Sequence, residues 1–324
     1  MVNFSQGQIA REPVGASEGY WAGAPGAFYA ADEAAWYLTY RIRRPRGVEP
    51  DRGGEARIAR STDLLKWEDI WSVNKSEYGT ASIERSALHK GPDNLWRYIT
   101  SYVDPADGRW CVALVRGKDP RAFRAGDGEK ILTAAPLGLE GIKDPWIMQH
   151  QGRYHMFLSV ATATPKTTGQ SHASLDIYNT GECVSATGLA TSDDLERWQW
   201  QDVIFGPAKN GWDGYCRRIN SVVESKGRFI GFYDGSASHK ENYEEKTGIA
   251  AAADFTSWGT LTPDGPAYVS PNASHSLRYI DAQACGDEMV IFYEFARADG
   301  AHDLRVLRMP RVEFDSSFTL PQRF

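Results

Sequence analysis

The 324-residue chain is poor in cysteine, with only four, and these lie far apart with no Cys-x-x-Cys spacing. Cysteines this far apart argue against a zinc site or a disulfide framework, so we expect reduced thiols in the core. The chain also has no apolar run of membrane-spanning length, and its first residues lack a basic start followed by an apolar core. These absences predict neither a membrane span nor a signal peptide. We therefore expect a cytoplasmic protein.

Positive charge is not in excess either, since the formal net charge is -6 and the isoelectric point is about 5.7. Such a chain is not an expected partner of nucleic acid or of an anionic membrane. Stretches with helical periodicity are missing. No Asp-rich loop has EF-hand spacing, and we predict no metal and no cofactor. The sequence does not indicate an oligomeric state.

Aromatic residues and glycine, by contrast, are abundant: aromatics make up 12% of the chain and glycines number 31. This mixture favours short strands and many turns over long helices. Five stretches repeat one pattern, which is a small or polar head, an apolar strand, a tight turn and an aromatic strand. They begin at Gly23, Ile83, Ile142, Cys216 and Leu277.

The repeat has a nearly constant period. The third residues of the heads form the column Pro25, Arg85, Asp144, Arg218 and Tyr279, which are 60, 59, 74 and 61 positions apart. Self-similarity at such a period is typical of a propeller, whose radial closure leaves few exposed edges. We predict an all-β, five-bladed β-propeller with four-stranded antiparallel blades around a central channel. It is a single domain over residues 1–324, with blades starting near residues 23, 83, 142, 216 and 277.

A second signature follows several of these hairpins, at residues 59–70, 190–202 and 251–261. Each copy has a small apolar strand, a Ser/Asp turn and a tryptophan. This pattern predicts an outer strand and a tryptophan that packs between sheets; stacking on a sugar ring is the alternative. The third repeat is the longest because of the Thr/Ser/Gly-rich segment 162–182, which we expect to loop over one face.

Propeller geometry brings the heads together. They precede the innermost strands, so they converge on one mouth of the channel, and the ends of the second strands, with Asp104 among them, return to the same face. This mouth gathers Arg41, Glu84, Arg85, Lys143, Asp144, Arg217, Arg218, Asp234, Arg278, Tyr279 and Glu294. Two interpretations are open: a ring of salt bridges that plugs the channel, or a site for an anionic ligand or a developing negative charge.

The five-fold hairpin repeat, the Lys-Asp-Pro head at residues 143–145 and the Ser-Asp-Leu-x-x-Trp turns resemble the five-bladed propeller glycosidases. These are, broadly, glycoside hydrolase families 43, 32, 62, 68, 117 and 130, and the resemblance spans about residues 20–310. It implies cleavage of a glycosidic bond in the central funnel. In family 43 and its relatives the funnel carries three acids: a base or nucleophile in the blade 1 head, an aspartate that tunes pKa and orients, and a glutamate that donates the proton.

The match to these acids is partial. Asp144 matches the second position, whereas the blade 1 head at residues 23–26 has no acid and the blade 4 head reads Arg217-Arg218 where the glutamate usually stands. We assign catalysis to Asp144 and Glu84 as the central pair, with Glu294, on an aromatic strand, as the proton donor. Substrate binding is assigned to Arg41, Arg85, Lys143, Arg217, Arg218, Asp234, His275, Arg278 and Tyr279. By analogy with family 117, His275 is a further candidate acid.

The preferred prediction is a glycoside hydrolase that acts on an anionic or unusual sugar by carboxylate acid/base catalysis, because arginine forks recognise uronates and sulfates bidentately. The first alternative is a glycoside phosphorylase or transferase whose basic ring binds phosphate. The second is a non-catalytic carbohydrate-binding propeller, which the missing blade 1 acid favours. In each case the expected partner is an oligosaccharide or glycoside.

Overall fold

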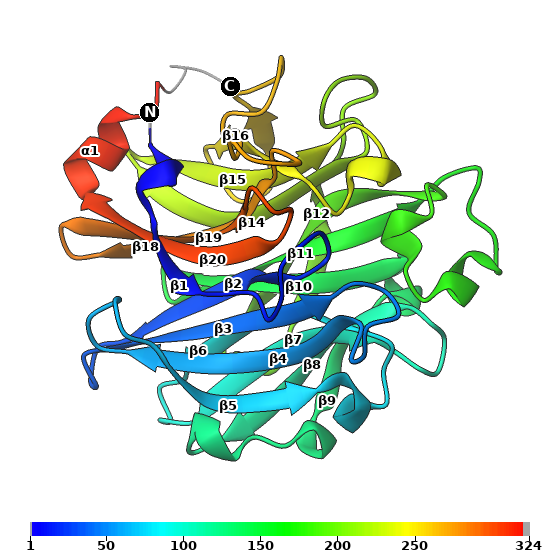
Figure 1. Ribbon diagram of the computed structural model, residues 1–324, viewed down its shortest axis with the longest axis horizontal. Coiled ribbons are helices and arrows are strands. Elements are labelled where there is room, and N and C mark those ends of the chain that lie inside the picture. Colours follow the sequence, from blue (N-terminus) through cyan, green and yellow to red (C-terminus); the bar gives the residue numbers. More distant parts are fainter. Residues whose placement is uncertain (1, 320–324) are drawn as a thin grey trace.

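Strands make up most of the secondary structure in the computed structural model, which describes residues 2–319 (Figure 1). The α-helix in this range is the short α1 (Arg311–Ser316). Single 3-10 turns lie at Phe4–Gln6, Lys75–Tyr78, Pro120–Ala122, Ala125–Asp127, Ala135–Leu137, Ser171–Ser174, Ile177–Asn179 and His239–Glu241. The predicted all-β class is confirmed. Residues 2–319 contain no helix with the length and hydropathy needed to span a bilayer.

The strands pair antiparallel in sets of four, which are consecutive in the chain except that the last set takes one strand from the start of the chain. Short parallel pairings join these sets into sheets of eight, eight and four strands. The first set is β2 (Trp21–Ala30), β3 (Ala35–Arg44), β4 (Arg52–Ser61) and β5 (Glu68–Asn74). The second is β6 (Ile83–Lys90), β7 (Trp96–Val103), β8 (Trp110–Gly117) and β9 (Glu129–Thr133). The third is β10 (Gly141–His150), β11 (Arg153–Ala163), β12 (Cys183–Ser192) and β13 (Gln199–Phe205).

The fourth set is β14 (Cys216–Ser225), β15 (Arg228–Ser236), β16 (Lys246–Ala252) and β17 (Trp258–Thr260). The last set is β18 (Leu277–Cys285), β19 (Glu288–Ala296), β20 (His302–Pro310) and, from the start of the chain, β1 (Gln8–Arg11). The leading strands of the sets therefore begin at residues 21, 83, 141, 216 and 277, close to the predicted repeat starts.

The leading strands lie around a common axis. Strand β2 contacts β6, β6 contacts β10, β10 contacts β14, β14 contacts β18, and β18 contacts β2 again. Figure 1 shows the sets fanned about the centre of the molecule. Because this arrangement returns to its own start, the leading strands have neighbours on both sides, and residues remote in the chain meet at the axis.

Each leading strand carries a β-bulge near its start. The register skips between Gly23 and Gly26 in β2, and the corresponding skips follow Ile83, Lys143, Ile219 and Arg278. Aligning the paired residues on either side places Ala24, Glu84, Asp144, Ile219 and Tyr279 in one column. The sequence column was therefore one residue out of register in three repeats: Glu84, not Arg85, is the counterpart of Asp144.

The bulges also shape the backbone. Ala24, Asp144 and Tyr279 have φ values of 53°, 56° and 53°, in the left-handed region. Residues other than glycine avoid this region at a cost of about 1–3 kcal/mol, and bulges that use it re-aim side chains and are common near active sites. Strain is thus concentrated at one end of the leading strands.

The Ser-Asp-Leu-x-x-Trp turns are built by side-chain bonds to the backbone. Ser61 Oγ accepts a hydrogen bond from the Leu64 amide at 2.9 Å, and Trp67 Nε1 donates to the Leu64 carbonyl at 3.1 Å. The same bonds recur at Ser192 and Trp198. Trp67, Trp198 and Trp258 each pack against a hydrophobic cluster of the core, as predicted for tryptophans with a packing role.

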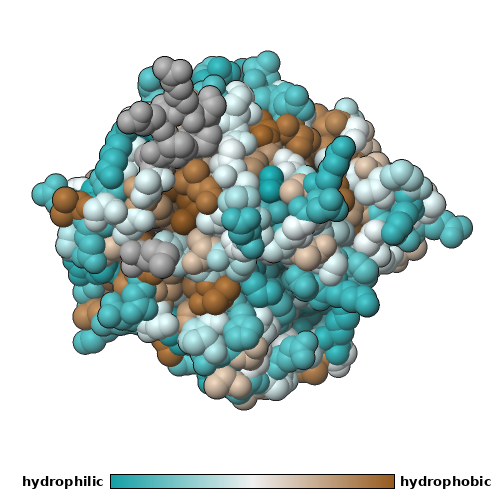
Figure 2. Space-filling model, turned by 90° about the horizontal axis from the view of Figure 1, so that it is seen from above, coloured by the Kyte–Doolittle hydropathy of each residue, from teal (hydrophilic) through white to brown (hydrophobic). Residues whose placement is uncertain are grey.

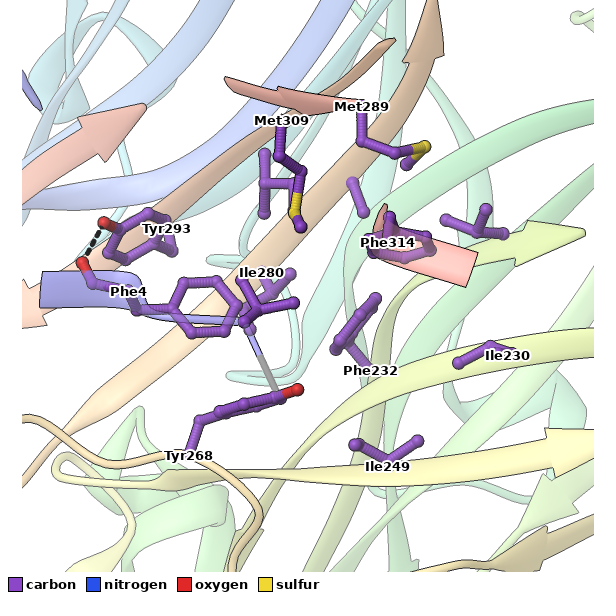
Figure 3. Packing of buried hydrophobic residues seen from close by; sticks show 14 of the residues in the cluster. Phe4, Ile230, Phe232, Ile249, Tyr268, Ile280, Met289, Tyr293, Met309 and Phe314 are labelled. Atoms are coloured by element: carbon purple, nitrogen blue, oxygen red, sulfur yellow. Dashed lines mark hydrogen bonds between the residues drawn. The ribbon is translucent and has the colours of Figure 1, made fainter. Parts of the chain in front are cut away.

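Both ends of the described chain are fastened to the last set. Strand β1 pairs with β20, and the Phe4 ring lies edge-on to Tyr268 and Tyr293, with ring centroids 4.7 and 4.9 Å apart. Phe314 of α1 packs against Phe232 in the same cluster, which Figure 3 shows with Ile280 and Met309. Burying one such ring contributes roughly 1.5–3 kcal/mol. The two ends of the described chain therefore stabilise the cluster formed with β18, β19 and β20.

Hydrophobic residues on the surface are scattered. Figure 2 shows them as small separate patches among hydrophilic residues on the face seen from above. The most exposed large ones are Leu65 at 62% and Val312 at 77%. Isolated exposed residues of this kind are ordinary on protein surfaces and do not indicate a binding site.

Candidate active site in a charged funnel

A narrow cavity opens where the leading strands begin, and we call it the funnel. Its volume is about 20 Å³, so in this state it holds little beyond a water molecule. It is lined by Arg41, Arg43, Arg52, Glu84, Trp110, Lys143, Asp176, Asn179, Arg218, Asn242, Tyr243, Glu245, Arg278 and Tyr279. Six of the residues predicted from the sequence are among them: Arg41, Glu84, Lys143, Arg218, Arg278 and Tyr279.

The funnel residue Tyr279 contacts two further predicted residues, Asp144 and Asp234, which are buried behind the residues that line the funnel. Its hydroxyl lies 3.5 Å from Asp144 Oδ2, and its amide donates to Asp234 Oδ1 at 3.0 Å. The side chains of both aspartates are almost inaccessible to solvent. Two carboxyls from different strand sets therefore meet at one bulge residue.

These two carboxyls have opposite pKa shifts. Burial alone would raise the pKa of Asp144, but the charges of Lys143 and Arg218 outweigh it and hold the pKa below its ordinary value; Lys143 Nζ lies 3.1 Å from Asp144 Oδ2. For Asp234, burial and the nearby charge of Glu245 raise the pKa to about 7. One carboxyl is thus held ionised, whereas the other gains and loses its proton near neutral pH, the division of labour that acid/base catalysis needs.

Glu294 has surroundings that contradict its predicted role as proton donor. Its carboxylate pairs with Arg278 at 2.6 Å, with Arg41 at 3.3 Å and with His302 at 2.8 Å. Burial would raise the pKa of Glu294, but the charges of Arg278 and Arg41 bring it well below the ordinary range. A proton donor needs the opposite shift. Glu294 is therefore a permanent anion that holds two arginines.

The same carboxylate fills the space beside the blade 1 head, where the sequence has no acid. Glu294 Oε2 accepts a hydrogen bond from the Ala24 amide at 3.1 Å. A Cβ on Gly23 would come within 1.7 Å of that oxygen, so only glycine leaves room for it. The head that lacks an acid is thus occupied by an acid from the neighbouring sheet.

Glu84, Glu245 and Asp176 are the carboxylates that line the funnel. Glu84 Oε2 lies 2.7 Å from Arg41 Nε, and Glu245 bridges Arg218 and Arg278, with Oε2 2.6 Å from Arg278 Nη1. Glu245 is not among the residues predicted from the sequence, because it lies just before β16 and outside the repeated heads. The signal for it was the polar run Tyr243-Glu244-Glu245 at the start of an otherwise small, apolar strand.

Arg85 does not line the funnel, contrary to its predicted role in substrate binding. Its side chain is fully buried on the axis, where Nε and Nη1 donate to the carbonyls of Pro25 and Asn220, both at 2.7 Å. Nη2 lies 3.6 Å from Asp281. Bulges leave backbone carbonyls without a strand partner, and Arg85 satisfies two of them. Its role is to close the channel below the funnel.

Three other predictions placed residues at this mouth wrongly. Successive residues of a strand face opposite sides, so Arg217 turns away from its neighbour Arg218 and pairs with Asp213 at 2.7 Å. Asp104 extends past the end of β7 and pairs with Lys130. His275 lies in a separate pocket of about 520 Å³ with Trp212, and its Nδ1 is 3.0 Å from the Ser270 carbonyl.

The salt-bridge interpretation is correct for many of these charges, yet the network does not satisfy every group. In the described chain, Arg41 Nη1, Trp110 Nε1 and Asn242 Oδ1 are buried at the funnel without a hydrogen-bond partner. Leaving such groups unpaired costs about 1–3 kcal/mol each. Two donors and an acceptor without partners, on residues that line one small cavity, suit a ligand rich in hydroxyl or carboxylate oxygens.

Metal ligands are not grouped anywhere in residues 2–319, since no cluster of three or more His, Cys, Asp or Glu side chains could hold an ion. The four cysteines are free thiols, and burial raises the pKa of Cys111, Cys183 and Cys216 to about 12 in each case. Such thiols are inert at neutral pH. The reactive groups of the funnel are carboxyls and guanidinium ions.

No protein-family model and no curated protein sequence matches the chain. Solved structures do. A thermostable family-43 glycoside hydrolase superposes with a TM-score of 0.64 at 14% identity, covering 89% of each chain. A β-1,2-mannobiose phosphorylase from Listeria innocua has a TM-score of 0.59 at 15% identity, covering 94% of this chain and 93% of that one.

A family-32 β-fructofuranosidase from Bombyx mori is also similar, with a TM-score of 0.64 at 15% identity over 94% of this chain and 63% of that one. These neighbours are β-propellers, and they show that the chain has a β-propeller fold. At such low identity the likeness establishes the fold but not the reaction, which depends on the residues of the funnel.

Proposed function

We propose that the protein is a glycoside hydrolase whose chemistry takes place in the funnel, on an anionic or otherwise unusual sugar. The proposal treats the five strand sets as the blades of one propeller domain over residues 1–324. The observation that carries it is that Tyr279 contacts both Asp144, through its hydroxyl, and Asp234, through its amide, while the pKa of Asp144 is lowered and that of Asp234 is raised to about 7. Glycosidases among the similar folds support the reaction class.

The two aspartates divide the work of glycoside cleavage. Asp234, with a pKa near 7 and a buried Oδ2 that has no hydrogen-bond partner, gives its proton to the departing sugar oxygen. Asp144, kept ionised by Lys143 and Arg218, acts on the anomeric carbon either directly or through a water molecule. Glu84 occupies the bulge position in the second set that Asp144 occupies in the third. We keep it as the carboxylate that was paired with Asp144 from the sequence, beside the proton donor Asp234.

The other funnel residues position the sugar. Trp110 Nε1 and Arg41 Nη1 are buried donors for sugar oxygens, and Asn242 Oδ1 is a buried acceptor for a hydroxyl. Glu294 and Glu245 hold Arg41, Arg218 and Arg278 in place. Such preorganised charges stabilise a transition state without reorganising during the reaction.

The leaving group tests the role of Asp234. We would assay Asp234→Asn on nitrophenyl and dinitrophenyl glycosides, aryl uronides included, with exposed Asp264→Asn as the matched control. Loss of a general acid lowers the rate by about 10²–10⁴-fold for the poorer nitrophenyl leaving group. It has little effect for dinitrophenyl, which leaves without a proton. An equal loss on both substrates would contradict the assignment.

Phosphorolysis is a second candidate, because two buried arginine nitrogens at the mouth, Arg43 Nε and Arg52 Nε, have no partner and suit a phosphate. A phosphorylase among the similar folds supports it. Incubation with a glycoside and inorganic phosphate would then yield a sugar 1-phosphate in place of the free sugar. If neither product forms and glycosides still bind, the protein is a carbohydrate-binding propeller without catalysis.

A further inference from the structure

Three loops cover the mouth of the funnel and meet at one carboxylate, that of Asp176. They are residues 45–51 between β3 and β4, residues 164–182 between β11 and β12, and residues 237–245 between β15 and β16. Asp176 Oδ2 accepts hydrogen bonds from Arg46 Nη2 at 2.6 Å and from the Tyr243 hydroxyl, and Arg52 Nη2 lies 3.6 Å away. The side chain of Asp176 thus joins loops of three strand sets.

The cations around Asp176 exceed what one carboxylate satisfies. Arg43 stacks over Tyr243 and Trp21, with its Cζ 4.3 and 4.8 Å from the ring centroids, and its nearest carboxylate oxygen, on Glu84, is 3.8 Å away. Arg43 and Arg52 are each only 6% exposed, and Nε of both has no hydrogen-bond partner. These buried donors indicate room for further acceptor oxygens.

The two oxygens of Asp176 have different partners: Oδ1 accepts a local hydrogen bond from Asn179 Nδ2 at 2.8 Å, whereas Oδ2 accepts hydrogen bonds from groups of the other two loops. Asp176 precedes the 3-10 turn Ile177–Asn179, where an aspartate ordinarily caps the turn's amides, yet its side chain makes no such bond. Its neighbour Leu175 has a φ of 53°, and Arg52, whose Nη2 donates to the Leu175 carbonyl at 2.8 Å, has a φ of 58°. The left-handed Leu175 ends the 3-10 turn Ser171–Ser174, where its amide donates to the His172 carbonyl at 2.9 Å. Left-handed backbone at residues other than glycine is also enriched at functional sites.

We propose that Arg43, Arg46, Arg52 and Tyr243 form a binding subsite for the carboxylate of a uronic acid residue, and that the Asp176 carboxylate occupies it as an internal substitute. The inference rests on the proposed function and specifies its substrate class. Arginine forks match planar carboxylates, and a carboxylate already fills the place. A uronate enters by displacing Asp176, which frees segment 164–182 and widens the funnel from its closed volume of about 20 Å³.

Removal of the competing charge tests this directly. We would titrate the wild type and Asp176→Asn by calorimetry with galacturonate, glucuronate, galactose and inorganic phosphate. Asp193→Asn, an exposed aspartate paired only with Arg153, is the matched control. The expected result is at least a tenfold gain in hexuronate affinity for Asp176→Asn, no change for galactose and no change in the control variant.

Three outcomes would overturn the proposal. Hexuronate affinity that does not rise in Asp176→Asn contradicts competition, an equal gain for galactose contradicts charge recognition, and a gain for phosphate alone assigns the subsite to phosphate. Because binding is measured, a chain that binds hexuronates and hydrolyses nothing contradicts the proposed function and leaves this inference standing.

Hydrogen exchange on the wild type covers the case in which Asp176→Asn does not fold. Galacturonate is expected to accelerate amide exchange in residues 164–182 because it releases the loop, whereas galactose leaves exchange unchanged. Unchanged or slowed exchange with saturating galacturonate would contradict displacement of Asp176.

Discussion

The two ends of the central channel are built from the same five strands and differ in almost every property. At their beginnings the strands enclose the funnel, about 20 Å³ in volume and crowded with ion pairs. At their far ends they surround a wide cavity of about 850 Å³, lined by residues such as Phe28, Trp146, Met148 and Gln283. Arg85 and Asp281 lie between the two.

The difference follows from the backbone. All five bulges lie near the funnel end, where the ladder is interrupted and side chains such as Asp144 and Tyr279 turn out of the regular alternation. Beyond the bulges the register is regular, and apolar side chains pack in the ordinary way. The candidate site thus lies where strand pairing is irregular, and the wide cavity lies where it is regular. Four predictions test this division.

The largest effect is expected on catalysis at the funnel end. Asp144→Asn removes the ionised carboxylate while keeping its shape, so kcat/KM on a turned-over glycoside should fall by about 10³-fold or more. Circular dichroism checks that the fold remains. Activity within tenfold of wild type would place the reacting carboxylate elsewhere.

The next effect concerns stability and compares two glutamates of strand β19. Glu294→Gln leaves buried Arg41 and Arg278 without their shared anion and should cost about 3–5 kcal/mol in the free energy of unfolding. Glu288→Gln, at the wide end of the same strand, breaks an exposed pair with Arg308 and should cost at most about 1 kcal/mol. Urea unfolding of both variants gives the comparison, and equal costs would refute it.

The third prediction is a pH dependence. The folded protein keeps a proton on Asp234 up to a pKa of about 7, whereas the unfolded chain releases it near the ordinary value of 3.8. The native state therefore holds more protons between these values, and this contribution to stability is full below about pH 4 and is lost as the pH rises through about 7. Asp234→Asn should remove that decline from the wild-type profile of melting temperature against pH. Parallel profiles would contradict the raised pKa.

The smallest effect is expected at the wide end. Gln149→Ala alters an exposed side chain of that cavity and should change activity by less than about twofold and stability by no more than about 0.5 kcal/mol. Enzyme assays and urea unfolding measure both quantities. A large loss of activity would show that the wide end shares in catalysis.

Sequence periodicity predicted the strand sets well because each hairpin depends on local turns and alternating apolar residues. The Ser-Asp-Leu-x-x-Trp turns and the small-residue strands carried enough signal to place the repeat starts within two residues. The alignment of the heads was less accurate. A bulge adds a residue without changing composition, so nothing local distinguished Glu84 from Arg85 as the counterpart of Asp144.

The roles of site residues depended on long-range contacts that the sequence does not show. The aromatic sequence neighbours of Glu294 predicted an apolar environment for it, yet Arg41 and Arg278 pair with it from two other strands. Asp234 was predicted at the mouth, but nothing in the sequence indicated its raised pKa, which comes from burial and from Glu245 outside the repeats. Strand alternation, applied strictly, would have separated Arg217 from Arg218.

The pairing of β1 with β20 has a consequence for synthesis. The ribosome delivers β1 first, and its partner emerges almost three hundred residues later. Until then the edges of the growing ring are open to pairing with other chains, which is the stage at which β-rich proteins aggregate. Circularly permuted genes that begin at β2 and carry β1 behind β20 through a linker would shorten the time that β1 itself stays unpaired.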